Sequence, residues 1–358
     1  LCVEWVLPTG EILTTGSSSI AGAGEFWAEG PGPDLRGLVR GYYGHAGGLG
    51  IVTKVAVKLH PWPGPPIFPV RGISIDQQGE LPPDKFRWYL ITYPTMKREI
   101  EAMYKIARAE IGIVLVRVPK LFMQGLLSNS REEAWKLIER DFFPNMVVIC
   151  IAAYTSEKQL EYEEKVLNEI IKETGGKLAP REVYDAFVPG ATLDLFRAGN
   201  AQRYMRLGST GLTPVLDMDS IDHAAKEFED LDPLLKDIVH EAKPEFVPPL
   251  MKSNDISWIC TYDFNVAHAE TPIKVAPSTE VLTKERCEKA WANALELAMA
   301  RVKQDLEKGY YFGRQMSRFH RILGPKWGNY HLILEKVKKA FDPNNVSNPP
   351  HPISVESS

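Results

Sequence analysis

The densest run of glycine in the chain lies between Gly41 and Gly50, where five of the ten residues are glycine. Glycine adopts positive φ without strain and lets a ligand approach the backbone closely. Successive backbone N–H groups in such a loop can bind an anion such as a phosphate. The run is therefore a candidate cofactor-binding loop. The alternative is an ordinary tight turn between a short helix and a strand, which also uses glycine.

The segment Gly309–Tyr330 near the C-terminus combines aromatic and basic side chains that could bind or deprotonate a substrate. Its members are Tyr310, Tyr311, Arg314, Arg318, His320, Arg321, Lys326 and Trp327. His320 has the side chain of a general base near neutral pH, although a lone histidine is often a structural hydrogen-bonding residue. Arg314 could bind an anionic group. Alternatively, Arg314 and Arg318 form an ordinary basic helix surface through their i, i+4 spacing.

Several other classes of site and partner find no support in the sequence. No P-loop motif is present, and no dinucleotide fingerprint lies between a strand and a helix. The four cysteines lie far apart, so we expect no metal site and mostly buried, reduced thiols in a cytoplasmic protein. The formal net charge is −4 without runs of like charge, and no apolar stretch reaches the roughly 18 residues of a membrane span. We therefore expect neither a nucleic-acid partner nor a membrane span.

The elements around the glycine run suggest how it is positioned. Residues 1–16 read as strand, Pro-Thr-Gly turn and strand, a β-hairpin that begins at the first residue, which suggests one part of a larger or split fold. Residues 15–34 are rich in Gly and Ser and predict a long loop of the kind that is often functional. Residues 35–42 predict a short helix. Residues 50–60 alternate strictly and predict a strand, with one face as follows: Ile51, Thr53, Val55, Val57 and Leu59.

A proline-rich stretch, Pro61 to Pro69, marks a domain junction because five prolines cannot lie in a helix interior or a central strand. From about 70 to 280, strands alternate with amphipathic helices, which predicts an α+β domain with helices on one face of an antiparallel sheet. Residues 180–250 have weaker periodicity and predict loops and short helices covering a site. Helices are predicted at 96–110, 130–142, 156–176, 283–309 and 330–341, and strands at 111–118, 146–154 and 256–264.

Two motifs, one at each end of the chain, resemble a known family. The run Gly44-His-Ala-Gly-Gly-Leu-Gly-Ile-Val-Thr53 is similar to the Gly-Ser-Glu-Gly-Thr-Leu-Gly-Ile-Ile/Val-Thr segment of the vanillyl-alcohol oxidase / p-cresol methylhydroxylase superfamily. The preceding order of LPTGE, TG and GPDL also resembles that family. Asp342-Pro343 and Asn348-Pro349, after a helix, are similar to its C-terminal motif. The match covers roughly residues 1–62 and 305–350.

The resemblance implies a domain order and a cofactor. Residues 1–62 would form the second half of a PCMH-type FAD-binding domain, 63–304 a substrate or cap domain, and 305–358 a C-terminal segment that returns to the flavin site. FAD would be bound by the following residues: His45, Ala46, Gly47, Gly48, Leu49, Gly50, Ile51 and Val52. Arg314 would contact the flavin or a substrate anion, with Tyr310 and His320 as further catalytic candidates. Gly313 stands where phenol-oxidising members carry a second Tyr, and His45-Ala46 replace their Ser-Glu.

The family's activity implies a FAD-dependent oxidoreductase that oxidises an aromatic alcohol, a phenol or a hydroxy acid by hydride transfer to flavin N5. The metal-associated histidine motifs of the hydroxy-acid branch are absent, so no metal is expected. Because the sequence lacks the N-terminal half of the FAD domain, a separate chain or segment would supply it, in a homo- or hetero-oligomer. The alternative is a non-catalytic or half-site subunit that assembles with a flavin-binding chain.

Overall fold

The computed structural model of the chain divides into two compact units, residues 1–60 with 312–358 and residues 61–311, which are described separately here. We call them the first and second units. The structure describes these residues: 2–26, 30, 32–33, 35–39, 44–57, 59, 61–73, 77–118, 145–197, 210–212, 215–218, 257–260, 267–270, 273–275, 284–285, 288, 303, 307–308, 320 and 324–355. Within these residues no helix has the length and apolar character needed to cross a membrane.

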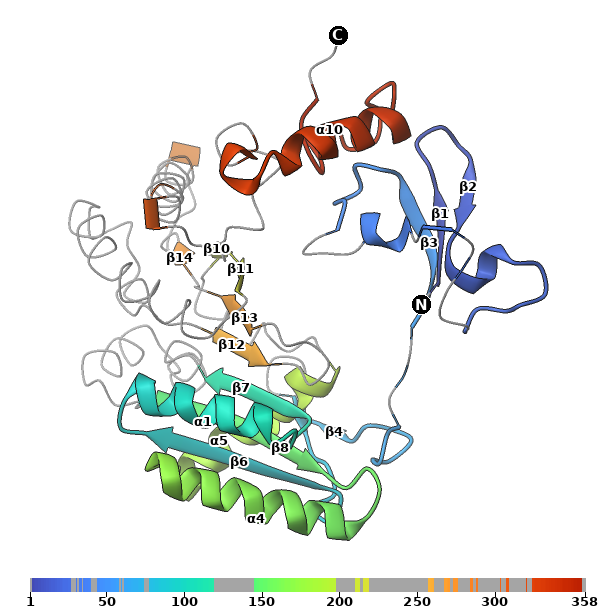
Figure 1. Cartoon of the computed structure of the whole chain (residues 1–358). Coiled ribbons are helices and arrows are strands. Elements are labelled where there is room, and N and C mark those ends of the chain that lie inside the picture. The colour runs from blue at the N-terminus through green and yellow to red at the C-terminus, as the bar shows by residue number, and fades with distance from the viewer. Residues whose placement is uncertain are drawn as a thin grey trace. The chain divides into compact units, whose positions relative to one another are not determined.

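A three-stranded antiparallel sheet forms the centre of the first unit, in the order β2-β1-β3 (Figure 1). The strands are β1 (Cys2–Val6), β2 (Ile12–Thr14) and β3 (Ile51–Ala56). The predicted hairpin is present, because β1 pairs with β2 and the N–H of Gly10 donates to the carbonyl of Leu7 at 2.8 Å in the turn. Because β3 begins at Ile51, the glycine run that ends at Gly50 leads directly into this sheet.

The strict alternation predicted for residues 50–60 is interrupted by a bulge. Glu4 pairs with Lys54 but Trp5 pairs with Val52, so Thr53 is passed over in the register. As a result Val52 and Val55 face the same side as Trp5, whereas Ile51 faces the other side. The prediction that Ile51, Thr53 and Val55 share one face is therefore wrong. The strand also ends at Ala56, before the predicted end at residue 60.

The core of the first unit joins the beginning of the chain to its end. Helix α10 (Tyr330–Phe341) packs Val337 and Phe341 against the buried Val3, Trp5 and Leu49. Trp5 is completely buried, and its ring stacks on Phe341 with centroids 5.5 Å apart. The helix predicted at 330–341 is confirmed in its full length. The short helix predicted at 35–42 is a 3₁₀ helix, η2 (Leu35–Leu38).

The second unit is built on a seven-stranded antiparallel sheet in the order β11-β13-β12-β7-β8-β6-β9. Its strands are β6 (Phe86–Tyr93), β7 (Val114–Val118), β8 (Asn145–Ala152), β9 (Lys177–Leu178), β11 (Val215–Met218), β12 (Ser257–Cys260) and β13 (Ala267–Glu270). Two further pairs are β4 (Val70–Arg71) with β5 (Gln78–Gly79), and β10 (Thr210–Leu212) with β14 (Ile273–Val275). The predicted mixture of helices with an antiparallel sheet is confirmed.

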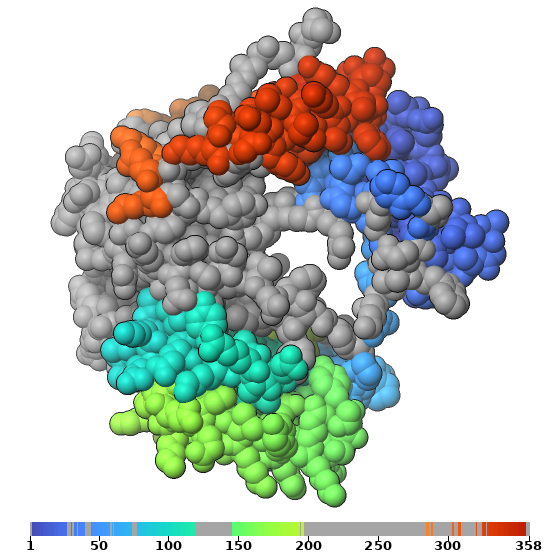
Figure 2. Space-filling view, viewed as in Figure 1, coloured from blue at the N-terminus to red at the C-terminus, as the bar shows by residue number. Residues whose placement is uncertain are grey.

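Helices cover both faces of this sheet. Helices α1 (Met96–Arg108) and α4 (Glu157–Thr174) lie side by side and pack on β6 and β8 (Figures 1 and 2). Helix α5 (Arg181–Arg197) packs Phe187, Val188 and Ala191 against Leu90, Val116 and Val148. Leu90 is followed and preceded on β6 by residues that face the other way, and one of them, Tyr89, donates its hydroxyl to Glu164 on α4, so α5 lies on the opposite face from α4 and its neighbour α1. The expected one-sided covering is wrong for this reason.

Local sequence signals account for the ends of two of these helices. The Ser156 hydroxyl accepts the N–H of Gln159 at the start of α4, and Gly175 ends the helix at φ 72°. Thr95 caps α1 through the N–H of Arg98 in the same way.

The expectation of loops and short helices after residue 180 is wrong for residues 181–197, which form a helix despite Pro189. The helix predicted at 130–142 and most of the helix predicted at 283–309 lie outside the described residues.

Candidate functional site

The glycine loop, defined here as residues 44–50, is a series of turns that leads from η2 into β3. Four of its residues have positive φ: Gly44 (50°), Ala46 (48°), Gly47 (73°) and Gly50 (113°). An added Cβ would lie 2.6 Å from the Val39 carbonyl oxygen at Gly44, and 2.2 Å from that of Val6 at Gly50. The loop thus needs glycine for both conformation and close approach.

The carbonyl side of the loop is bound by the C-terminal segment. The Asn348 side-chain amide donates to the Ala46 carbonyl at 2.6 Å, and the Ser347 hydroxyl donates to the Gly47 carbonyl at 2.7 Å. The Lys338 ammonium donates to the Gly48 carbonyl at 2.5 Å. Three successive carbonyls are therefore held by residues about 300 positions later in the chain.

The N–H side of the loop is occupied by His45. The Gly48 N–H donates to the His45 carbonyl at 2.8 Å, and the Leu49 N–H donates to His45 Nδ1 at 3.4 Å. The His45 ring is 8% exposed and stacks on Trp5 with centroids 5.3 Å apart. Burial is the main cause that lowers the pKa of His45, and the positive charge of Lys338 lowers it further. A neutral ring with Nδ1 as acceptor is the form that this arrangement favours.

These contacts determine which backbone N–H groups of the loop are available to a flavin nucleotide. The N–H groups of Gly48 and Leu49 bond to His45, and that of Gly50 donates to Ser347 Oγ at 3.0 Å. Residues 48–50 therefore do not form an open anion cage. At Gly47, by contrast, an added Cβ would have no neighbour closer than 3.8 Å. The backbone of the loop is therefore less crowded at Gly47 than at Gly44, Gly48 or Gly50, and the assignment of His45–Val52 to FAD remains a prediction.

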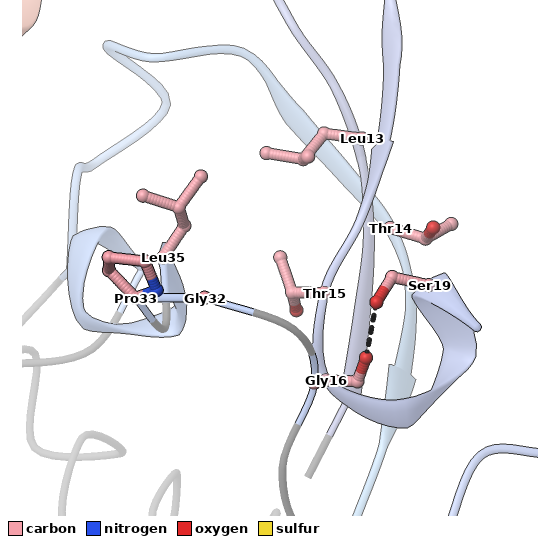
Figure 3. Close-up of a pocket in the computed structure, with 9 residues that line it drawn as sticks. Leu13, Thr14, Thr15, Gly16, Ser19, Gly32, Pro33 and Leu35 are labelled. Carbon is pink, nitrogen blue, oxygen red and sulfur yellow. Dashed lines mark hydrogen bonds between the residues drawn. The ribbon is translucent and has the colours of Figure 1, made fainter.

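A cavity of about 230 Å³ lies beside the end of β2 (Figure 3). It is lined by Leu13, Thr14, Thr15, Gly16, Ser19, Gly30, Gly32, Pro33 and Leu35. Two of its hydroxyl groups bond to the chain itself: Ser19 donates to the Gly16 carbonyl at 2.7 Å, and Thr15 Oγ1 accepts the Val3 N–H at 3.2 Å. None of the lining residues ionises, so the cavity offers shape and apolar contact but no acid or base. Six of its nine lining residues lie in the loop predicted at 15–34, and the other three lie in β2 and η2.

Of the three catalytic candidates near the C-terminus, the structure describes only His320. Tyr310 and Arg314 lie outside the described residues, so their roles stay predictions. His320 is 4% exposed, and its Nε2 lies 3.8 Å from Glu335 Oε1 on α10. A base role would require this buried ring to reach substrate, and that role also stays a prediction. In the part of the chain that the structure describes, no group of three or more His, Cys, Asp or Glu side chains could hold a metal ion.

The sequence analysis assigned no role to the residues that hold the loop. Lys338 and Asp342 form a buried ion pair at 2.7 Å, and their side chains are 0% and 1% exposed. Burial alone would raise the pKa of the Asp342 carboxyl, but hydrogen bonds from Lys338 and from the N–H groups of Ser347 and Val346 outweigh it and lower the pKa. The signal that could have revealed them is the i, i+4 pair of Lys and Asp directly before the Asn348-Pro349 motif.

Comparisons with known proteins place this geometry in a known fold. No family model and no curated protein matches the sequence. Among solved structures, 4-ethylphenol oxidase from Gulosibacter chungangensis, in complex with isoeugenol, matches 97% of the chain with a TM-score of 0.66 at 15% identity. p-Cresol methylhydroxylase with substrate bound matches 100% of the chain with a TM-score of 0.64, also at 15% identity. An alkyldihydroxyacetonephosphate synthase matches 98% with a TM-score of 0.51 at 13% identity.

The chain spans about two thirds of the two phenol-transforming enzymes, 64% and 65% of their chains, and 52% of the synthase. The resemblance predicted from the two end motifs is thereby confirmed at the level of the fold. This chain has the fold of p-cresol methylhydroxylase and 4-ethylphenol oxidase.

Proposed function

We propose that this chain is the larger part of a FAD-dependent oxidoreductase that oxidises a small organic substrate by hydride transfer to the flavin. The observation that carries the proposal is the match over 97–100% of the chain to two enzymes named for 4-ethylphenol and p-cresol. The family that the sequence resembles binds FAD. The two enzyme names favour a phenol or aromatic alcohol over a hydroxy acid as substrate.

The roles of the chain's residues follow from this proposal. The bound flavin would supply the two-electron oxidation chemistry, and the protein would supply orientation and charge. The nucleotide would lie against the glycine loop at Gly47, where the backbone is uncrowded. Arg314 would stabilise negative charge on the flavin or on the substrate. Tyr310 and His320 would act near the substrate.

A second candidate function is a half-site or non-catalytic subunit that assembles with a separate flavin-binding chain, in a homo- or hetero-oligomer. One observation favours it: the N–H groups of Gly48, Leu49 and Gly50 already have partners within the chain. A chain with this loop would depend on contacts from elsewhere to bind the diphosphate.

The visible absorption spectrum separates the two functions. The 358-residue chain is purified with added FAD, alone and together with a polypeptide that supplies the N-terminal half of a FAD domain, and passed through a desalting column. Retained flavin absorbance that is bleached by an alkylphenol under anaerobic conditions supports the oxidoreductase. Flavin retained only in the presence of the added polypeptide indicates a split site. The absence of retained flavin in every case would refute the proposal and favour the non-catalytic subunit.

A further inference from the structure

The C-terminal Asp-Pro and Asn-Pro motif has no role in the function proposed so far, yet it contacts the glycine loop directly. Ser347 and Asn348 donate to the carbonyls of Gly47 and Ala46, and Ser347 Oγ also accepts the Gly50 N–H. These bonds join segments about 300 residues apart. The C-terminal segment therefore bonds directly to the backbone of the loop.

Lys338 is the centre of this contact. Its ammonium group is completely buried and donates to three oxygens: the Gly48 carbonyl at 2.5 Å, Asp342 Oδ2 at 2.7 Å and the Ser347 carbonyl at 2.6 Å. An ammonium group has three donors, so all three have an acceptor. Asp342 in turn accepts the N–H groups of Val346 and Ser347 at 2.9 and 2.8 Å.

A buried ion pair of this kind contributes little net stability, because the desolvation of two charges offsets their attraction. Its effect here is to orient the peptide group between Gly48 and Leu49. In a trans peptide the N–H and the carbonyl point in opposite directions, so Lys338, by holding the Gly48 carbonyl, turns the Leu49 N–H toward His45. The C-terminal segment thus holds the carbonyls of residues 46–48 and the Gly50 N–H, whereas His45 accepts the N–H groups of Gly48 and Leu49.

We infer that Lys338 is a positioning residue that fixes the glycine loop in its nucleotide-binding conformation, supported by Asp342 and by the Ser347-Asn348 segment. The inference rests on the proposed function, since it requires that the loop contact a flavin nucleotide. Lys338 itself acts through the Gly48 carbonyl and does not need to touch the nucleotide. The C-terminal motif is thereby part of the cofactor site without belonging to its surface.

The test uses Lys338→Met, which removes the charge while keeping a long apolar side chain, in the longest polypeptide that binds FAD. Lys339→Met is the matched control, because Lys339 is the next residue on the same helix and is exposed. Ser347→Ala is a second variant that removes two bonds to the loop without disturbing the buried charge. Hydrogen exchange of residues 44–50 is measured without cofactor. Flavin affinity and the circular dichroism of the bound flavin are measured with cofactor.

We expect Lys338→Met to raise exchange in the loop at least tenfold, to weaken FAD binding at least tenfold and to alter the flavin dichroism, while α10 stays protected. Ser347→Ala should change the same quantities in the same direction by a smaller factor, and Lys339→Met should change none. If Lys338→Met and Ser347→Ala alter loop exchange but leave flavin affinity and dichroism as in the wild type, the residues are structural anchors only and the inference is wrong. Unchanged loop exchange in both variants would also overturn it.

If the wild-type protein fails to bind flavin, the proposed function and the cofactor part of this inference are refuted together. The exchange measurements would still decide whether Lys338 fixes the loop. A wild type that binds flavin beside variants that bind it equally well would refute the inference alone.

Discussion

The substitution Gly48→Ala tests the contact between the glycine loop and the C-terminal segment most directly. A Cβ at Gly48 would lie 1.8 Å from the His351 carbonyl oxygen, 2.1 Å from its carbon and 2.5 Å from the Pro352 nitrogen, far inside the 3.4 Å at which ordinary contact begins. All three atoms belong to the backbone, so no side-chain rotation can relieve the clash. The loop and residues 351–352 would have to move apart.

The cost can be worked from the bonds that such a movement breaks. The carbonyls of Ala46, Gly47 and Gly48 each accept one hydrogen bond from the C-terminal segment, and the Gly50 N–H donates a fourth to Ser347 Oγ. Each neutral bond is worth about 1 kcal/mol, and the bond from the charged Lys338 about 2 kcal/mol. We expect Gly48→Ala to lower the free energy of unfolding of the first unit by about 4–5 kcal/mol, more than a hundredfold in the unfolding equilibrium.

The matched control is Gly47→Ala, which has no neighbour closer than 3.8 Å but places alanine at φ 73°. The left-handed conformation costs a non-glycine residue about 1–2 kcal/mol. Denaturant titration followed by hydrogen-exchange mass spectrometry reports the two units separately through their own peptides. Equal effects of the two substitutions, within about 0.5 kcal/mol, would show that the Gly48 backbone contact is absent and would refute the reasoning.

Three further predictions concern buried groups. Because burial lowers the folded-state pKa of His45 below its usual 6.5, the unfolded chain takes up this proton first. The free energy of unfolding of the first unit should therefore fall as pH decreases below about 6.5. The substitution His45→Gln should remove this part of its pH dependence. Parallel pH profiles of the unfolding free energy for variant and wild type would contradict the prediction. Arg117 and Glu99 form a buried ion pair at 3.0 Å, so Arg117→Met should cost the second unit about 3–5 kcal/mol. The double variant with Glu99→Leu should be more stable than Arg117→Met alone, and failure of that recovery in denaturant titration would count against the pair. Trp5→Ala should cost the first unit about 3–5 kcal/mol, and a loss below about 1 kcal/mol would mean that its stacking on Phe341 is not maintained.

Local patterns in the sequence predicted the elements whose signals lie within a few residues. Ser156 and Gly175 mark the ends of α4 directly, and an apolar stripe predicted α1. Helix α5 was missed because Pro189 is normally a helix breaker, whereas packing of Phe187 and Val188 on the sheet stabilises the helix there. Tertiary contact overrides local propensity at this position.

The candidate site was predicted less completely for a related reason. The glycines were interpreted as a place where a ligand approaches the backbone, but a glycine carries no information about what approaches it. At Gly48 the neighbour is His351, and at Gly50 it is Val6. The bulge at Thr53 likewise could not be predicted from the sequence, because it depends on the register of β1 against β3. The resemblance at the two ends supplied the fold that local patterns could not.

The pairing of the first strand with the last helix has a consequence for synthesis. The core around Trp5 is completed by Val337 and Phe341, which leave the ribosome after the whole of residues 61–311. The hairpin of β1 and β2 is therefore translated well before the helix that packs against it. Its contact with Val337 and Phe341 can form only after residues 61–311 have been synthesised.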